Sequence, residues 1–106
     1  MPSPDTIEAL ERRVLRALCT HPNGERYENC VSSLGSHVWR DAEHRVVYEA
    51  VRRIGFLPPD VRRRELPAEV TRLGFPDLDC SGYFEGECVT PGELPELIRL
   101  LRTRPD

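Results

Sequence analysis

The sequence predicts an all-α fold, a compact bundle of five to six helices in a single domain. Apolar residues recur at helical spacing in several segments, capping residues and prolines mark helix starts, and glycines mark helix ends. No stretch shows the sustained apolar and polar alternation of a half-buried strand. A chain of 106 residues has the size of one domain, so we expect residues 1–106 to fold together, with residues 1–4 and 103–106 as flexible ends.

The first helix is predicted from a cap and an apolar face. Asp5, followed three residues later by Glu8, has the form of a capping box, and Pro22 with Gly24 predicts the end of the helix. One face of this helix collects the apolar side chains, namely Ile7, Leu10, Val14, Leu15 and Leu18. We expect the charged side chains to take the opposite, solvent-facing side, namely Glu8, Glu11, Arg12, Arg13 and Arg16.

Two further helices follow. A short second helix is predicted from helical spacing that Gly35 ends, and its apolar residues are Tyr27, Cys30, Val31 and Leu34. Asp41 can cap a third helix that runs through Ile54, because Asp is a preferred residue at that position. The third helix has a broad apolar stripe made of Val46, Val47, Ala50, Val51 and Ile54.

Prolines divide the second half of the chain. Because Pro58 and Pro59 exclude a continuous helix, we expect Pro67 to be the first residue of a short helix that ends at Gly74. A further short segment is expected around Cys80, Tyr83 and Phe84, between Pro76 and Gly86. A closing helix is predicted from Thr90 as its cap, Pro91 in its first turn and Glu93 three residues after the cap, with its buried face made of Leu94, Leu97, Ile98 and Leu101.

Composition and charge exclude several classes of protein. With 15 basic residues, all of them arginine, against 18 acidic ones, the net charge is −3, so there is no overall basic field to attract nucleic acid or anionic membranes. No stretch approaches the roughly 20 apolar residues that span a bilayer. Without a signal peptide, we expect a cytoplasmic protein with free thiols and no membrane contact.

The residues that could carry chemistry do not form a recognisable catalytic or metal site. Zinc sites need two matched sets of closely spaced ligands, which Cys19, Cys30, Cys80 and Cys88 lack, so we expect these cysteines to be small buried hydrophobic residues. His44 has acidic neighbours, but no Ser or Cys nucleophile is placed to use it, and a structural role is expected. Glycine-rich phosphate-binding motifs are also absent from the sequence. We therefore expect no catalytic residues, no metal, no cofactor and no enzyme activity.

The densest positive charge is a candidate contact surface. It is made of Arg52, Arg53, Arg62, Arg63 and Arg64. These side chains either contact an acidic partner or nucleic acid, or belong to a solvated helix end whose field Asp60, Glu65 and Glu69 dilute. A small nucleic-acid-binding helical protein is therefore the alternative function. Trp39 and Tyr48 are candidates for interface anchors or core residues, and the core is favoured for Trp39.

Residues 39–50 carry a resemblance to a known family. They read Trp-Arg-Asp-Ala-Glu-His-Arg-Val-Val-Tyr-Glu-Ala, which resembles the aromatic-x-Asp-x-x-His-Arg-x-hydrophobic-aromatic-x-Ala pattern in the amino-terminal domain of DnaB-type replicative helicases. The Glu-x-x-Val-Leu text of residues 11–15 looks like the opening helix of that family. Residues 18–22, which read Leu-Cys-Thr-His-Pro, are similar to a helix end in the related helicase-binding domain of bacterial primases.

The resemblance implies a function. In both families the domain is non-catalytic and mediates contacts within the helicase ring or between helicase and primase. It implies for this chain a protein-protein interaction module associated with DNA replication, whose partner is a helicase, a primase or a second copy of the chain. The matching residues Asp41, His44 and Arg45 are then expected to cap and brace the third helix rather than to bind a partner.

Overall fold

Helix α1 (Ile7–Thr20) is the central element of the fold, and most of the other helices pack against it. The computed structural model describes residues 7–85 and 92–103. The other elements are α2 (Glu25–Ser33), α3 (Ala42–Ile54), α4 (Pro59–Arg72), the 3-10 turn η1 (Ser81–Tyr83) and α5 (Leu94–Thr103). In these described segments there is no strand, so the prediction of an all-α fold is confirmed.

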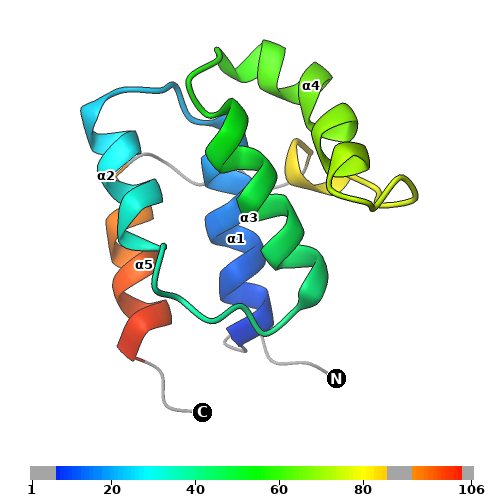
Figure 1. The fold of residues 1–106 in the computed structure, drawn as a ribbon. Coiled ribbons are helices and arrows are strands. Elements are labelled where there is room, and N and C mark those ends of the chain that lie inside the picture. The colour runs from blue at the N-terminus through cyan, green and yellow to red at the C-terminus, as the bar shows by residue number, and fades with distance from the viewer. Residues whose placement is uncertain (1–6, 86–91, 104–106) are drawn as a thin grey trace.

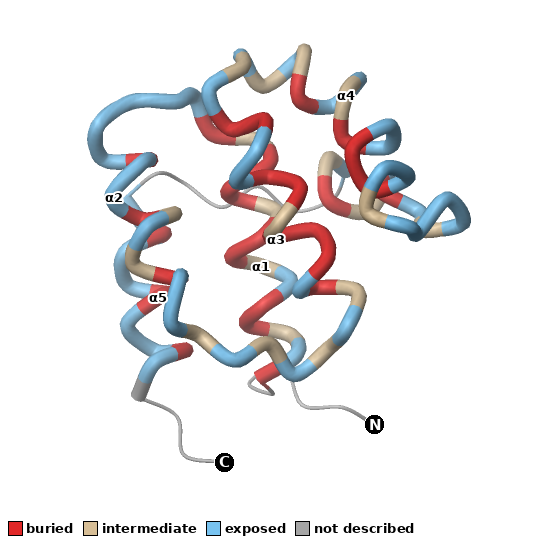
Figure 2. Tube along the Cα trace, in the orientation of Figure 1, coloured by how far each residue is buried: buried red, intermediate tan, exposed pale blue. Residues whose placement is uncertain are grey.

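The helices lie around α1 on two sides. In Figure 1, α2 and α5 lie side by side on one side of α1 and α3, and α4 with η1 lies on the other. The Cα radius of gyration is 12.8 Å, close to the value of about 13 Å for a compact domain of 100 residues. Figure 2 shows the buried positions of each helix turned toward the middle of this arrangement.

The third helix begins and ends where the sequence predicts. Asp41 is its N-cap, and the Asp41 carboxylate accepts a hydrogen bond from the backbone N–H of Glu43 at 2.9 Å. The predicted apolar stripe, including Val47 and Val51, is buried against α1 and α4. The structure thereby confirms both the cap and the core face of α3.

The start of α4 differs from the prediction. The helix begins at Pro59, not at Pro67, and Pro67 lies in its interior. Proline has no backbone N–H to donate. In the first turn of a helix this costs nothing, because N–H groups there have no partner within the helix, so Pro59 fits. In the interior, Pro67 leaves the carbonyl four residues earlier without its usual donor. Helix α4 still forms because Arg62, Leu66 and Val70 are buried on one face at spacings of four residues. The predicted start at Pro67 left out Arg62, the first member of this face.

The end of α4 agrees with the prediction. Gly74 has a φ of 97°, a left-handed conformation that favours glycine. The backbone N–H of Phe75 donates to the carbonyl of Val70 at 3.0 Å, and the backbone N–H of Gly74 donates to the carbonyl of Thr71 at 3.0 Å. These two bonds form the Schellman motif that satisfies the last carbonyls of a helix.

Several expected features lie outside the described residues. They are the Asp5 part of the first capping box, Gly86, Cys88, the Thr90 and Pro91 start of the closing helix, and the flexible ends at residues 1–4 and 104–106. Thr103, which we expected in the flexible end, is the last residue of α5. The predicted buried face of α5 is confirmed, since Leu94, Leu97, Ile98 and Leu101 are all buried.

Candidate functional site

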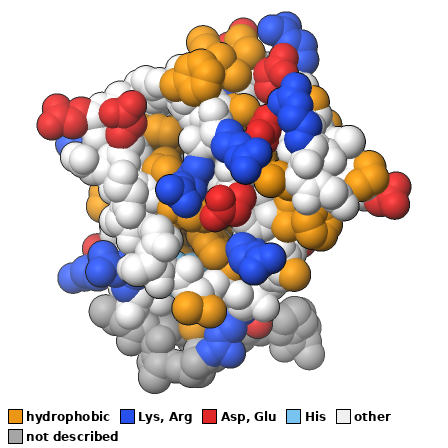
Figure 3. Space-filling view, viewed as in Figure 1, with side chains coloured by type: hydrophobic (Ala, Val, Ile, Leu, Met, Phe, Trp, Pro, Cys, Tyr) orange, Lys and Arg blue, Asp and Glu red, His pale blue; other side chains and the backbone are white. Residues whose placement is uncertain are grey.

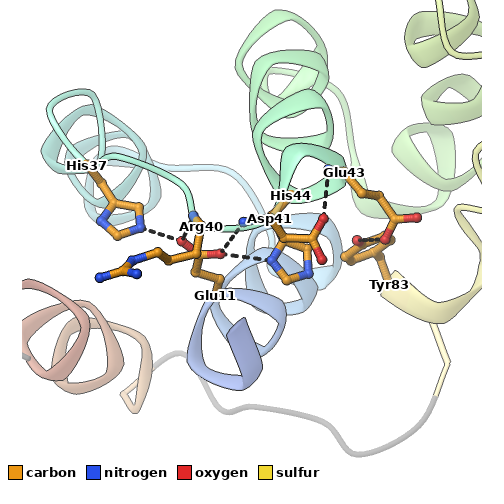
Figure 4. A network of polar contacts seen from close by, with 7 residues as sticks. All are labelled: Glu11, His37, Arg40, Asp41, Glu43, His44 and Tyr83. Atoms are coloured by element: carbon orange, nitrogen blue, oxygen red, sulfur yellow. Dashed lines mark hydrogen bonds and ion pairs between the residues drawn. The ribbon is translucent and has the colours of Figure 1, made fainter. Parts of the chain in front are cut away.

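A buried carboxylate, Glu11, is the centre of the most extensive polar network in the described part of the chain (Figure 4). The residue is fully buried in the middle of α1. His37 Nε2 donates to one carboxylate oxygen at 2.7 Å, and His44 Nδ1 donates to the other at 3.0 Å. The backbone N–H groups of Arg40 and Asp41 donate to the same carboxylate at 2.8 and 3.4 Å. Four donors therefore converge on two oxygens.

The surroundings of Glu11 keep it ionised. Burial by itself raises the pKa of Glu11, because a charged carboxylate is costly away from water. Hydrogen bonds from His44, from the Arg40 backbone and from His37 oppose this effect, and the pKa ends below its usual value of 4.5. An ionised Glu11 thus ties the loop before α3 to the middle of α1.

The network continues from α3 to η1. Tyr83, which is fully buried, donates its hydroxyl to Glu43 Oε2 at 2.8 Å. Its ring meets the ring of His44 edge to face, with centroids 6.4 Å apart. Burial and the hydrogen bond to Glu43 raise the pKa of Tyr83, so this hydroxyl remains a donor at neutral pH. The contacts brace the first turn of α3 from a segment 40 residues away in sequence.

The expectation that Glu11 faces solvent is wrong. A signal for its burial was present, because Glu11 lies four residues after Ile7 and three before Val14, inside the apolar stripe of α1. The expected structural role of His44 fits its position, since it is buried and bonded to Glu11. Because both Glu11 oxygens accept hydrogen bonds and the carboxylate is buried, this arrangement braces the fold.

The described cysteines are buried, as the sequence predicts. Cys19, Cys30 and Cys80 are all free thiols in the core. Burial raises the pKa of Cys19, and burial together with the nearby Asp79 and Glu43 carboxylates raises the pKa of Cys80 to about 11. Both thiols are protonated at neutral pH, and a protonated thiol is a poor nucleophile and a poor metal ligand. Over residues 7–85 and 92–103, no three His, Cys, Asp or Glu side chains are grouped as a metal site.

Arg62 does not belong to an exposed basic patch. Its side chain is 0% exposed, so the expectation that it contacts a partner or nucleic acid is wrong. Its Nη1 donates to the carbonyls of Leu18 and Cys19 at 2.9 and 3.2 Å, and its Nε donates to that of Leu57 at 3.0 Å. The guanidinium also lies over the ring of Tyr27, 4.7 Å from the centroid. Arg62 is thus a cap for the C-terminal end of α1, where a positive charge is favourable.

Three of the remaining four arginines of the patch face carboxylates. Arg52 pairs with Glu49 at 3.6 Å, Arg53 with Glu69 at 3.4 Å, and Arg63 with Glu85 at 3.5 Å. Arg64 is exposed and has no ion pair among the described residues. In Figure 3, acidic side chains lie between the basic ones over α3 and α4, and no continuous basic surface forms there. The local charge is therefore mixed.

The segment before α3 presents one apolar side chain to solvent. Val38 is 81% exposed, the most exposed of the large hydrophobic residues described. Its neighbour Trp39 packs against the core instead, with its ring 4.7 Å from that of His37 and 5.0 Å from that of Tyr48. Trp39 is therefore partly buried and packs against the core, the side that the sequence favours, and Val38 is the exposed position that sequence reasoning missed.

Comparisons of this chain with protein-family models, with curated proteins and with solved structures find no match. No helix in the described segments combines the length and apolar character needed to cross a membrane.

Proposed function

We propose that this chain is a non-catalytic protein-interaction module of the DNA replication machinery, which docks onto a replicative helicase or a primase. The observation that carries the proposal is the pattern of residues 39–50, which resembles the amino-terminal domain of DnaB-type helicases. This segment spans the cap and most of α3, the helix joined to α1 by the Glu11 network.

The structural roles of the pattern support an interaction module rather than an enzyme. Asp41 caps α3, and His44 is buried on Glu11, so neither side chain is presented to a substrate. A module of this kind acts through its exposed surface, and Val38 places an apolar side chain on that surface directly before the pattern.

The alternative function, nucleic-acid binding through the arginine patch, has less support. Arg62 is buried, and Arg52, Arg53 and Arg63 each face a carboxylate. Phosphate binding would require these pairs to be replaced, in a domain whose net charge is −3.

A binding measurement with purified proteins tests the proposal. The chain is titrated against the replicative helicase and, separately, the primase of its own organism, up to tens of micromolar, where even weak specific pairs are detected. Saturable binding to either one is the expected result, and absence of binding to both overturns the proposal. A parallel titration with DNA at low salt checks the alternative, which requires an affinity that falls steeply as salt is raised.

A further inference from the structure

We draw no further inference here: the strongest candidate, the surface around the exposed Val38 in the segment between α2 and α3, carries none, because nothing in the structure shows what covers it.

Discussion

Replacing Glu11 with alanine tests whether the buried network holds α1 and the α3 segment together. The substitution leaves four donors without their acceptor, from His37, His44 and the backbones of Arg40 and Asp41. Each unsatisfied buried group costs about 1–3 kcal/mol, but such costs are not additive, and removing one partner of a buried ionic network typically costs about 3–5 kcal/mol. We therefore expect the free energy of unfolding to fall by about 3–5 kcal/mol, a large part of the roughly 5–15 kcal/mol of an ordinary domain.

Substitution with glutamine isolates the contribution of the charge. Glu11→Gln preserves the shape of the side chain and one carbonyl acceptor, so we expect a smaller loss of about 1–3 kcal/mol near neutral pH. The pKa of Glu11 lies below 4.5 in the folded state, so its charge stabilises the fold above about pH 4.5, and this contribution is lost as the pH falls through the folded-state pKa. The difference in the free energy of unfolding between wild type and Glu11→Gln is therefore expected to become smaller as the pH is lowered.

Urea unfolding followed by circular dichroism measures both effects. Glu28→Ala is the control, since Glu28 is exposed in the first turn of α2 and its loss is expected to cost no more than about 1 kcal/mol. If Glu11→Ala were no more destabilising than Glu28→Ala, the four converging donors would not depend on the carboxylate, and the reasoning would be refuted. A gap between wild type and Glu11→Gln that widens in acid would show that the sign of the pH dependence is wrong.

Three other substitutions test the helix ends and the interior of α4, each by its change in urea midpoint. Asp41→Ala is expected to cost about 1 kcal/mol, because the N–H of Glu43 loses its cap, and Asp41→Asn is expected to recover most of that loss. Arg62→Met is expected to lower the free energy of unfolding by about 2–4 kcal/mol, because the last carbonyls of α1 lose their donors. Its control, Arg64→Met on the exposed side of α4, is expected to change that free energy by no more than about 0.5 kcal/mol, and equal effects of the two would contradict the cap assigned to Arg62. Pro67→Ala is expected to stabilise the protein by about 1 kcal/mol, because the helix-interior penalty of proline exceeds its benefit in the unfolded state, and a destabilised variant would show that the ring makes contacts that outweigh that penalty.

Local signals were enough to predict most of the helices. The Asp41 cap, the apolar stripe up to Ile54 and the stop at Gly74 depend on neighbouring residues and backbone conformation alone, and the structure confirms each of them. The helical spacing of α1 and α5 likewise identified their buried faces.

The two charged residues at the centre of the fold could not be assigned from local signals. Glu11 and Arg62 occupy buried positions of helical stripes, and a charge is tolerated there only when its partners are brought from elsewhere. The histidine partners of Glu11 lie 26 and 33 residues away, and the carbonyls that accept from Arg62 Nη1 lie 43 and 44 residues away. Because the prolines place the predicted helix start at Pro67, the first half of α4 is absent from the prediction, and the arginine patch includes Arg62, which the fold uses internally.

The Glu11 network also bears on where binding specificity lies. Two of the three polar positions of the 39–50 pattern, Asp41 and His44, cap and brace α3, whereas the third, Arg45, is exposed. At Asp41 and His44 the pattern therefore describes architecture. Arg40, which the pattern leaves unspecified, bonds to Glu11 through its backbone while its side chain extends away from the network (Figure 4). The same carboxylate thus fixes the segment that presents Val38 to solvent. Loss of Glu11 is expected to lower the free energy of unfolding, whereas loss of the exposed Val38 is expected to leave it nearly unchanged, and that contrast separates the support of this segment from the surface that it presents.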